Sequence, residues 1–249
     1  MIDSYRKLAK FMLGACLLGL TSCAGMVQGP PPGATPPSGY SPPTAERAGF
    51  WWSCRFKVVW PPDEDPDFSV DLLLAHAVVM PVLKEHESNL IYWRFHRRAA
   101  RDKTGHQFSF LFYSDPHTAE EVFGEIRRST FLNDAMEAKI VESITTDDTA
   151  SPARSRVEDF SDPSWSPTLQ RNWPSFIMGV SALWLGLIDE AMAEAPRGGA
   201  DIRASLGRYR EADTALSSIW NKEGQHAFLH HLSAIFGYKP MLIRKEITF

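Results

Sequence analysis

The fold is decided by one short stretch, Gln107-Phe108-Ser109-Phe110-Leu111-Phe112-Tyr113. Phenylalanine recurs there at every second position, and successive side chains of a strand point to opposite faces of a sheet. The alternation therefore predicts a strand over residues 107–113 with its phenylalanines on one buried face. The polar run Arg101–Gly105 before it predicts a hairpin loop to the preceding strand.

The segments on either side alternate between strand and helix patterns. Aromatic and β-branched residues predict further strands over residues 50–60, 90–98 and 139–145. Apolar residues at helical spacing follow Ser69, and Pro81 should kink that helix. Asp115-Pro116 predicts the start of a second helix. The order strand-helix-strand-strand-helix-strand over residues 50–146 is that of a ferredoxin-like, split βαβ unit, so we expect an α+β fold.

The rest of the chain, residues 147–249, predicts a mostly helical half. A connection containing prolines comes first, and helical patterns then cover residues 176–192, 202–220 and 223–236. The first of these helices is apolar around much of its circumference and close to the lower length limit for a membrane span. We expect a buried core helix instead. The segment 241–249 alternates weakly and suits a strand or a surface segment. We therefore expect residues 50–249 to form a single α+β domain.

Alternation also predicts a polar face on the sheet, opposite the phenylalanines. The residues that would share it as a ligand or partner face are Arg55, Lys57, Tyr92, Arg94, His96 and Arg98. These cationic groups with a tyrosine could bind an anionic or polar partner. Alternatively, they are solvated or paired with acidic side chains of the later helices, and a register shift of one residue would disperse them.

A second candidate site lies in the sequence Glu223-Gly224-Gln225-His226-Ala227-Phe228-Leu229-His230. On a helix, His226 and His230 are one turn apart, with Glu223 one turn earlier, and such a set can ligate a transition metal. It lacks the glutamate that follows the first histidine in HExxH metalloproteases. A polar helix face without metal is the alternative, and we expect no other cofactor.

The N-terminus has the pattern of an export signal. Arg6, Lys7 and Lys10 precede an apolar run that is too short to span a bilayer, and Leu20-Thr21-Ser22-Cys23 follows. This order resembles the signal and lipobox of bacterial lipoproteins. The resemblance implies that residues 1–22 are a signal peptide and that Cys23 becomes an N-terminus acylated with palmitate or similar chains. It also implies membrane anchoring, and Ala24 favours the outer membrane, facing the periplasm. The globular part resembles no family by its residue motifs.

Residues 23–49 are then a lipidated cysteine with a tether rich in proline, glycine and serine, a composition that favours an extended spacer. Removal of residues 1–22 takes three basic residues and one acidic residue from a chain of formal charge −4, which leaves −6. Such a balance argues against a nucleic-acid partner. Cys54 is the one cysteine left after processing and lipidation, so we expect no internal disulfide and a buried, apolar role for it.

These observations predict a membrane-anchored envelope lipoprotein that acts as a non-catalytic accessory or binding module for a protein or an envelope polymer. The nucleophile elbow, the phosphate-binding loop and the Cys-x-x-Cys pair are all absent from the sequence. The alternative is a metal-dependent or hydrolytic envelope enzyme that uses Glu223, His226 and His230. A third hypothesis is a small-ligand binder between sheet and helices.

Overall fold

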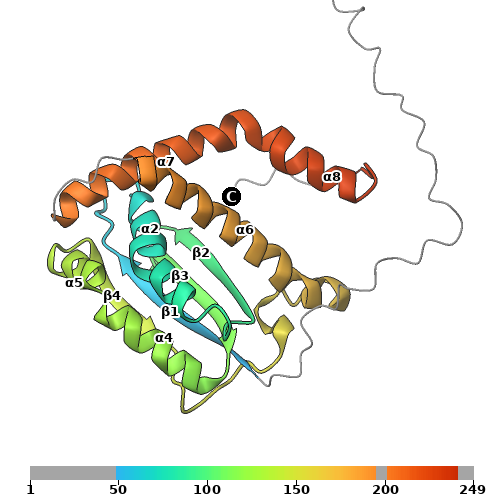
Figure 1. Ribbon diagram of the computed structural model, residues 1–249, viewed down its shortest axis with the longest axis horizontal. Helices are drawn as coiled ribbons and strands as arrows, with labels where there is room; N and C mark the ends of the chain where they lie inside the picture. The colour runs from blue at the N-terminus through green and yellow to red at the C-terminus, as the bar shows by residue number, and fades with distance from the viewer. Residues whose placement is uncertain (1–48, 195–200, 241–249) are drawn as a thin grey trace, which may run out of the picture. The chain divides into compact units, whose positions relative to one another are not determined.

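Four strands form one antiparallel sheet in the computed structural model, which describes residues 49–194 and 201–240 (Figure 1). The strands are β1 (Phe50–Val58), β2 (Tyr92–Ala99), β3 (His106–Ser114) and β4 (Val141–Thr146). They lie in the order β2-β3-β1-β4. The signal, Cys23, nearly all of the predicted tether and the segment 241–249 lie outside the described residues.

The pairing of β1 with β3 is nine residues long and runs from Phe50 opposite Ser114 to Val58 opposite His106. Each strand presents apolar side chains at every second position on the same face, and Phe108, Phe110 and Phe112 are completely buried there. The predicted strand at the centre of the sheet is confirmed. Gly105 ends the turn before β3 with φ +69°, a conformation that glycine adopts without a Cβ clash.

Helices cover the apolar face of the sheet (Figure 1). One continuous helical run between β1 and β2 comprises α2 (Ser69–Leu73), the π-helical turn η1 (Leu74–Val79) and α3 (Met80–Glu85). The predicted disturbance at Pro81 takes the form of that π-turn, because proline cannot donate the backbone hydrogen bond that a regular helix requires.

A second helical pair, α4 (Pro116–Arg128) and α5 (Thr130–Glu137), connects β3 to β4. Asp115 caps α4 by accepting a 3.0 Å hydrogen bond from the Thr118 amide, and Pro116 takes the first helical position, as predicted. The fold up to β4 is therefore a mixed α/β layer pair with an antiparallel sheet. Cys54 lies fully buried in its core, and burial raises the pKa of the thiol.

The C-terminal half is helical, as predicted, but its boundaries differ. A short 3₁₀ turn, η2 (Val157–Phe160), interrupts the connection, and α6 (Pro167–Glu194) starts before the predicted position. The next two predicted helices are one continuous run of α7 (Ile202–Gly224), the π-turn η3 (Gln225–His230) and α8 (His231–Ile235). They do not separate because no residue between 220 and 223 breaks the helix.

The prediction that α6 is a buried core helix is wrong, because only one side of the helix is buried. Leu185, Ile188 and Met192 are buried, whereas Phe176 and Leu183 are nearly half exposed. The reason is that α6 packs along the edge strand β2 and meets the core on one side only. Within the described residues, Pro167–Ala193 is long and apolar enough to cross a membrane by length and composition, and 22% of its most apolar window is buried.

Replacement of Phe110 by alanine should lower the free energy of unfolding by about 3–5 kcal/mol, because the ring is completely buried between Phe95 and Phe112. Urea unfolding of the purified protein measures the change. Phe131→Ala in α5 is the matched control, since that ring is 43% exposed and its loss should cost less than about 1 kcal/mol. Equal losses in the two variants would contradict the assignment of the core face.

Candidate functional site

The predicted polar residues do share one face of the sheet. The strand register places Arg55 and His96 on either side of Ser109, and it places Lys57 and Arg98 on either side of Gln107. Arg94 lies two residues from His96 on the same face of β2. We call Arg55, Lys57, Arg94, His96 and Arg98 the polar sheet face. The one-residue register shift that would disperse these residues does not occur in the β1–β3 and β2–β3 pairings.

Three of these cations have acidic partners. Arg55 pairs with Asp147 at 2.8 Å, Lys57 pairs with Glu142 at 3.4 Å, and Arg98 pairs with Asp102 of the hairpin loop. The acids come from β4, from the turn after it and from the hairpin. The suggestion that later helices supply the partners is therefore wrong for these three residues, because the neighbouring strands and loops are closer.

Arg94 and His96 differ from the other three, since neither forms an ion pair with any described residue. The Nε of Arg94 is buried without a hydrogen-bond partner in the described chain, and its guanidinium lies 6.0 Å from the Phe160 ring. Burial lowers the pKa of Arg94. Desolvation and the nearby charges of Arg94 and Arg98 lower the pKa of His96. An anion placed beside this pair would relieve both effects.

Tyr92 does not belong to this open surface, which corrects the prediction. It is 7% exposed and packs with Trp51 and Tyr113 in a separate aromatic cluster at one end of the face. Phe160 closes that cluster, with its ring 5.2 Å from Trp51. The chain after β4 folds back over the end of the sheet and covers the tyrosine, which alternation within one strand cannot reveal.

Asp147 holds this returning segment in place. Its carboxylate accepts hydrogen bonds from the backbone amide of Ser53 at 2.9 Å and from Arg55 at 2.8 Å, and Arg154 lies 3.5 Å away. In addition, the Trp51 indole donates to the Val157 carbonyl at 2.8 Å. The segment after β4, which covers this end of the polar sheet face, is therefore hydrogen-bonded to β1 at several points.

The candidate metal ligands lie elsewhere, on the long C-terminal helix. The His226 and His230 rings stack at 5.2 Å, and His231 lies 5.3 Å from His226. Glu223 is exposed one turn earlier, at the end of α7. Within the described part of the chain, no group of three or more His, Cys, Asp or Glu side chains is arranged to hold a metal ion. The geometry thus brings the histidines together without completing a ligand set.

One buried polar network was not predicted. Asp71 of α2 is completely buried. One of its carboxylate oxygens accepts a 2.9 Å hydrogen bond from Arg97 Nε, and the other lies 2.9 Å from His106 Nε2. Arg97 also lies over the rings of Phe68 and Trp184. The network ties α2, β2, β3 and α6 together. Its one signal in the sequence is an aspartate inside an apolar helical stretch, which requires a partner that the sequence does not identify.

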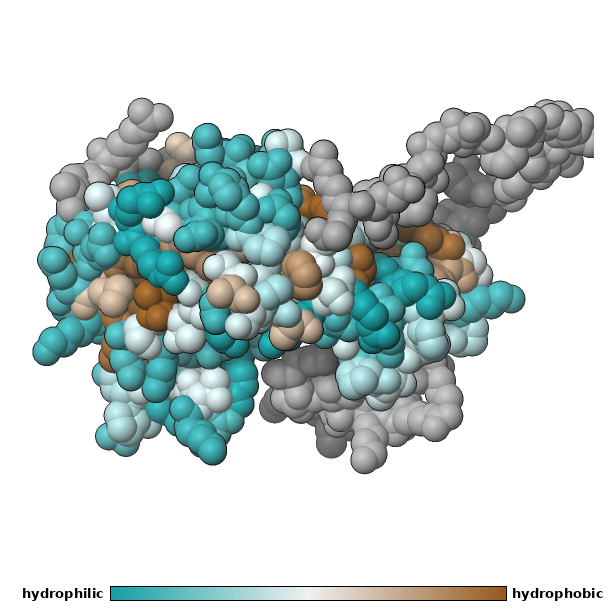
Figure 2. Space-filling view, turned by 90° about the horizontal axis from the view of Figure 1, so that it is seen from below, coloured by the Kyte–Doolittle hydropathy of each residue, from teal (hydrophilic) through white to brown (hydrophobic). Residues whose placement is uncertain are grey.

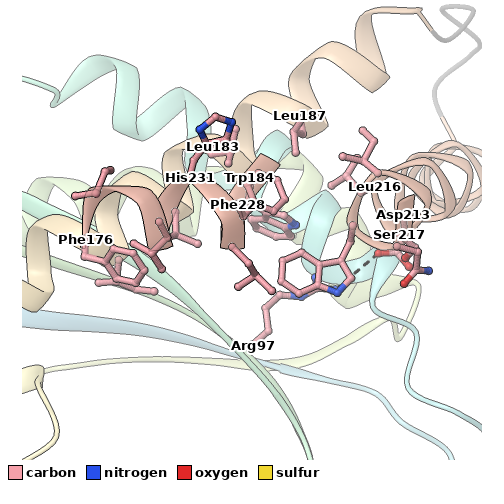
Figure 3. Close-up of a pocket in the computed structure, with 18 residues that line it drawn as sticks. Arg97, Phe176, Leu183, Trp184, Leu187, Asp213, Leu216, Ser217, Phe228 and His231 are labelled. Atoms are coloured by element: carbon pink, nitrogen blue, oxygen red, sulfur yellow. Dashed lines mark ion pairs between the residues drawn. The ribbon is translucent and has the colours of Figure 1, made fainter. Parts of the chain in front are cut away.

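A second unpredicted feature is an apolar groove of about 720 Å³ between α6 and the run α7–η3–α8 (Figure 3). Phe176, Val180 and Leu183 form one wall, and the opposite wall contains Trp220, Leu229 and Ile235. We call it the helical groove. Arg97 and Asp213 form a 3.9 Å ion pair at one side. The sequence signal for the groove is that α6 is apolar around much of its circumference. A helix that only contacts the core needs a single apolar stripe.

The side of the molecule shown in Figure 2 is mostly hydrophilic, and its hydrophobic residues form separate spots. Most of the large exposed apolar residues, by contrast, belong to α6 and to the chain from Trp220 to Tyr238.

Comparisons with known proteins identify no family for this chain. No family model matches it, and no curated protein does. Among solved structures, the crystal structure of TsrL matches with a TM-score of 0.33 and 13% sequence identity. The match covers 76% of this chain and 49% of that one, so the chain spans about half the length of TsrL. At this TM-score the likeness carries no argument about fold or function.

Asp71→Ala should lower the free energy of unfolding by about 3 kcal/mol, because it leaves Arg97 and the buried His106 without their shared carboxylate. Chemical denaturation followed by circular dichroism measures this. Asp134→Ala on the exposed surface of α5 is the control and should change stability by less than about 0.5 kcal/mol. A stable Asp71→Ala protein would show that the network contributes nothing to the fold.

Proposed function

We propose that this chain is a lipid-anchored, non-catalytic binding module of the bacterial envelope, and that the polar sheet face contacts its partner. The partner is a protein or an envelope polymer that carries anionic groups. The lipobox pattern at Leu20–Cys23 supports the anchor and a location at the outer membrane. The anchor would keep the domain within reach of the membrane, where both kinds of partner occur.

One observation carries the proposal: among the residues that the structure describes, Arg94 and His96 have no acidic partner, whereas Arg55, Lys57 and Arg98 on the same face each form an ion pair. An unpaired, partly buried guanidinium is costly unless a ligand compensates it. Ser109 and Gln107 lie between these residues in the strand register, and the Gln107 amide donates a 3.1 Å hydrogen bond to the Ser109 hydroxyl. Anionic recognition explains this arrangement better than a purely structural role does.

We also propose that the sheet unit belongs to the ferredoxin-like class. Three features support this: the strand order β2-β3-β1-β4, the antiparallel pairing throughout, and the helical connections from β1 to β2 and from β3 to β4. In such a unit the helices occupy one face, and the opposite face is available for contacts. A strand order from an experimental structure tests this assignment.

The double variant Arg94→Gln, His96→Gln should lose most of its binding to an anionic envelope polymer. We would use purified peptidoglycan sacculi as the probe and measure the fraction of protein that pellets with them. Wild-type binding should fall with rising salt, because exposed charge pairs are screened. Loss of the Arg94 charge and of the His96 imidazole, which a bound anion would favour in its protonated form, should weaken binding about tenfold or more.

The matched control for that experiment is Lys84→Gln, Lys103→Gln, which removes positive charge from exposed positions outside the polar sheet face. It should pellet like the wild type. Circular dichroism verifies that both variants are folded. Equal pelleting of both double variants, or a wild-type protein that pellets with no salt dependence, would refute the polar sheet face as the site for such a polymer.

Lipidation has its own test. We would replace residues 1–22 by a signal peptide of the non-lipoprotein type and change Cys23 to Ser, so that export continues without acylation. The wild type should incorporate labelled palmitate and sediment with membranes, because two or more acyl chains anchor stably. The variant should appear in the soluble periplasmic fraction. A variant that stays with the membrane would instead point to α6, which is apolar enough to span a bilayer.

A further inference from the structure

The helical groove has two apolar walls that remain exposed. On the α6 wall, Phe176, Val180 and Leu183 are 46%, 45% and 48% exposed. On the opposite wall, Trp220 is 63% exposed and Ile235 is 81% exposed. A ligand lying at the bottom of the groove would leave both rims in water. The occupant must therefore be wide enough to touch both walls.

The π-turn η3 keeps the second wall continuous. Trp220 and Phe228 are eight positions apart in the sequence, and on a regular α-helix their side chains would lie about 80° apart around the axis. A π-turn absorbs one extra residue and reduces the difference to about 20°. The two rings accordingly stack at 5.9 Å. The apolar stripe of α7 thus passes into α8 without rotating away from the groove.

The end of the second wall is also a protruding apolar element. Ile235, Phe236 and Tyr238 are all more than 60% exposed at the end of α8. The helix ends there with the Gly237 amide bonded to the Ala234 carbonyl at 2.9 Å and the Tyr238 amide bonded to the Ser233 carbonyl at 2.8 Å. This hydrogen-bonded cap fixes the apolar tip beside the groove.

The exposed apolar area matches what a stable dimer buries. The two walls and the tip together contain eight large apolar or aromatic side chains with exposed fractions of 45–81%. Together they expose on the order of 800 Å², which is about the area that each partner buries in an interface of standard size. It exceeds the largest apolar patch of a typical monomer, about 300–600 Å².

We propose that the helical groove is the interface with a second copy of this chain. The α8 tip of each copy enters the groove of the other, in an isologous contact. Within residues 49–194 and 201–240, no apolar segment occupies the groove and no apolar pocket receives the tip, and a second copy supplies both at once. Helices α6 and α7–α8 of the two copies then share one apolar core, in the manner of a four-helix bundle.

Cysteine cross-linking of the full chain in whole cells, whether or not it is membrane-anchored, tests this proposal. The native Cys54 is completely buried, and burial raises its pKa, so it does not compete for a thiol reagent. We would introduce a cysteine at the exposed edge of the wall opposite α6, by Leu229→Cys or Ile235→Cys, and add a short bismaleimide; we call these the rim cysteines. Denaturing gels should show a product of twice the monomer mass at one or both positions. The control positions Lys103→Cys and Phe131→Cys, exposed on other surfaces, should give none.

A second substitution on the opposite wall makes the test specific. Leu183→Glu, combined with the rim cysteine, should abolish the cross-link, because it places a charge in the shared core. Leu183 is 48% exposed, so the monomer should tolerate the change, and Val180→Glu on the same wall replaces it if the protein fails to accumulate. No rim cross-link, equal cross-links at the control positions, or a rim cross-link that survives the charged substitution would each overturn the proposal. The readout depends on neither the polar sheet face nor its partner.

Discussion

The structure depends on the nine-residue antiparallel pairing between β1 and β3. This register places every second side chain of both strands on the helix-covered face and the others on the polar sheet face. A shift of one residue would bury Arg55 and Lys57 and expose the phenylalanines. The large cost of that exchange makes the register unambiguous, and the positions of β2, β4 and the covering helices follow from it.

The two faces of the sheet are stabilised in different ways. On the apolar face, phenylalanine rings of β3 pack against α4 and α6 through contacts such as those of Phe112 with Phe123 and Phe108 with Trp184. On the other face, Asp147 and the Trp51 cluster fasten the chain that follows β4. This segment closes one end of the polar face and leaves the rest open, with Arg94 beside Phe160 of the closing segment.

Helix α6 connects the sheet to the second exposed surface. Ser181 accepts a 3.2 Å hydrogen bond from the Phe95 amide at the edge of β2, so the helix covers backbone that would otherwise be open to pairing with another strand. One stripe of α6, which contains Leu185, Ile188 and Met192, packs on the core beside this contact. Its remaining apolar stripe, at Phe176, Val180 and Leu183, faces the helical groove, and for this reason the helix is more apolar than a single buried face requires.

The sequence by itself determined the strands, the cap at Asp115, the buried role of Cys54 and the shared face of the cations, because these follow from periodicity and from contacts between near neighbours. Only the tertiary structure decided that Tyr92 is covered, that Asp71 meets Arg97 and His106, and that α6 is exposed on one side. Each of these depends on segments far apart in the chain, and local pattern contains no information about which distant segment arrives at a given surface.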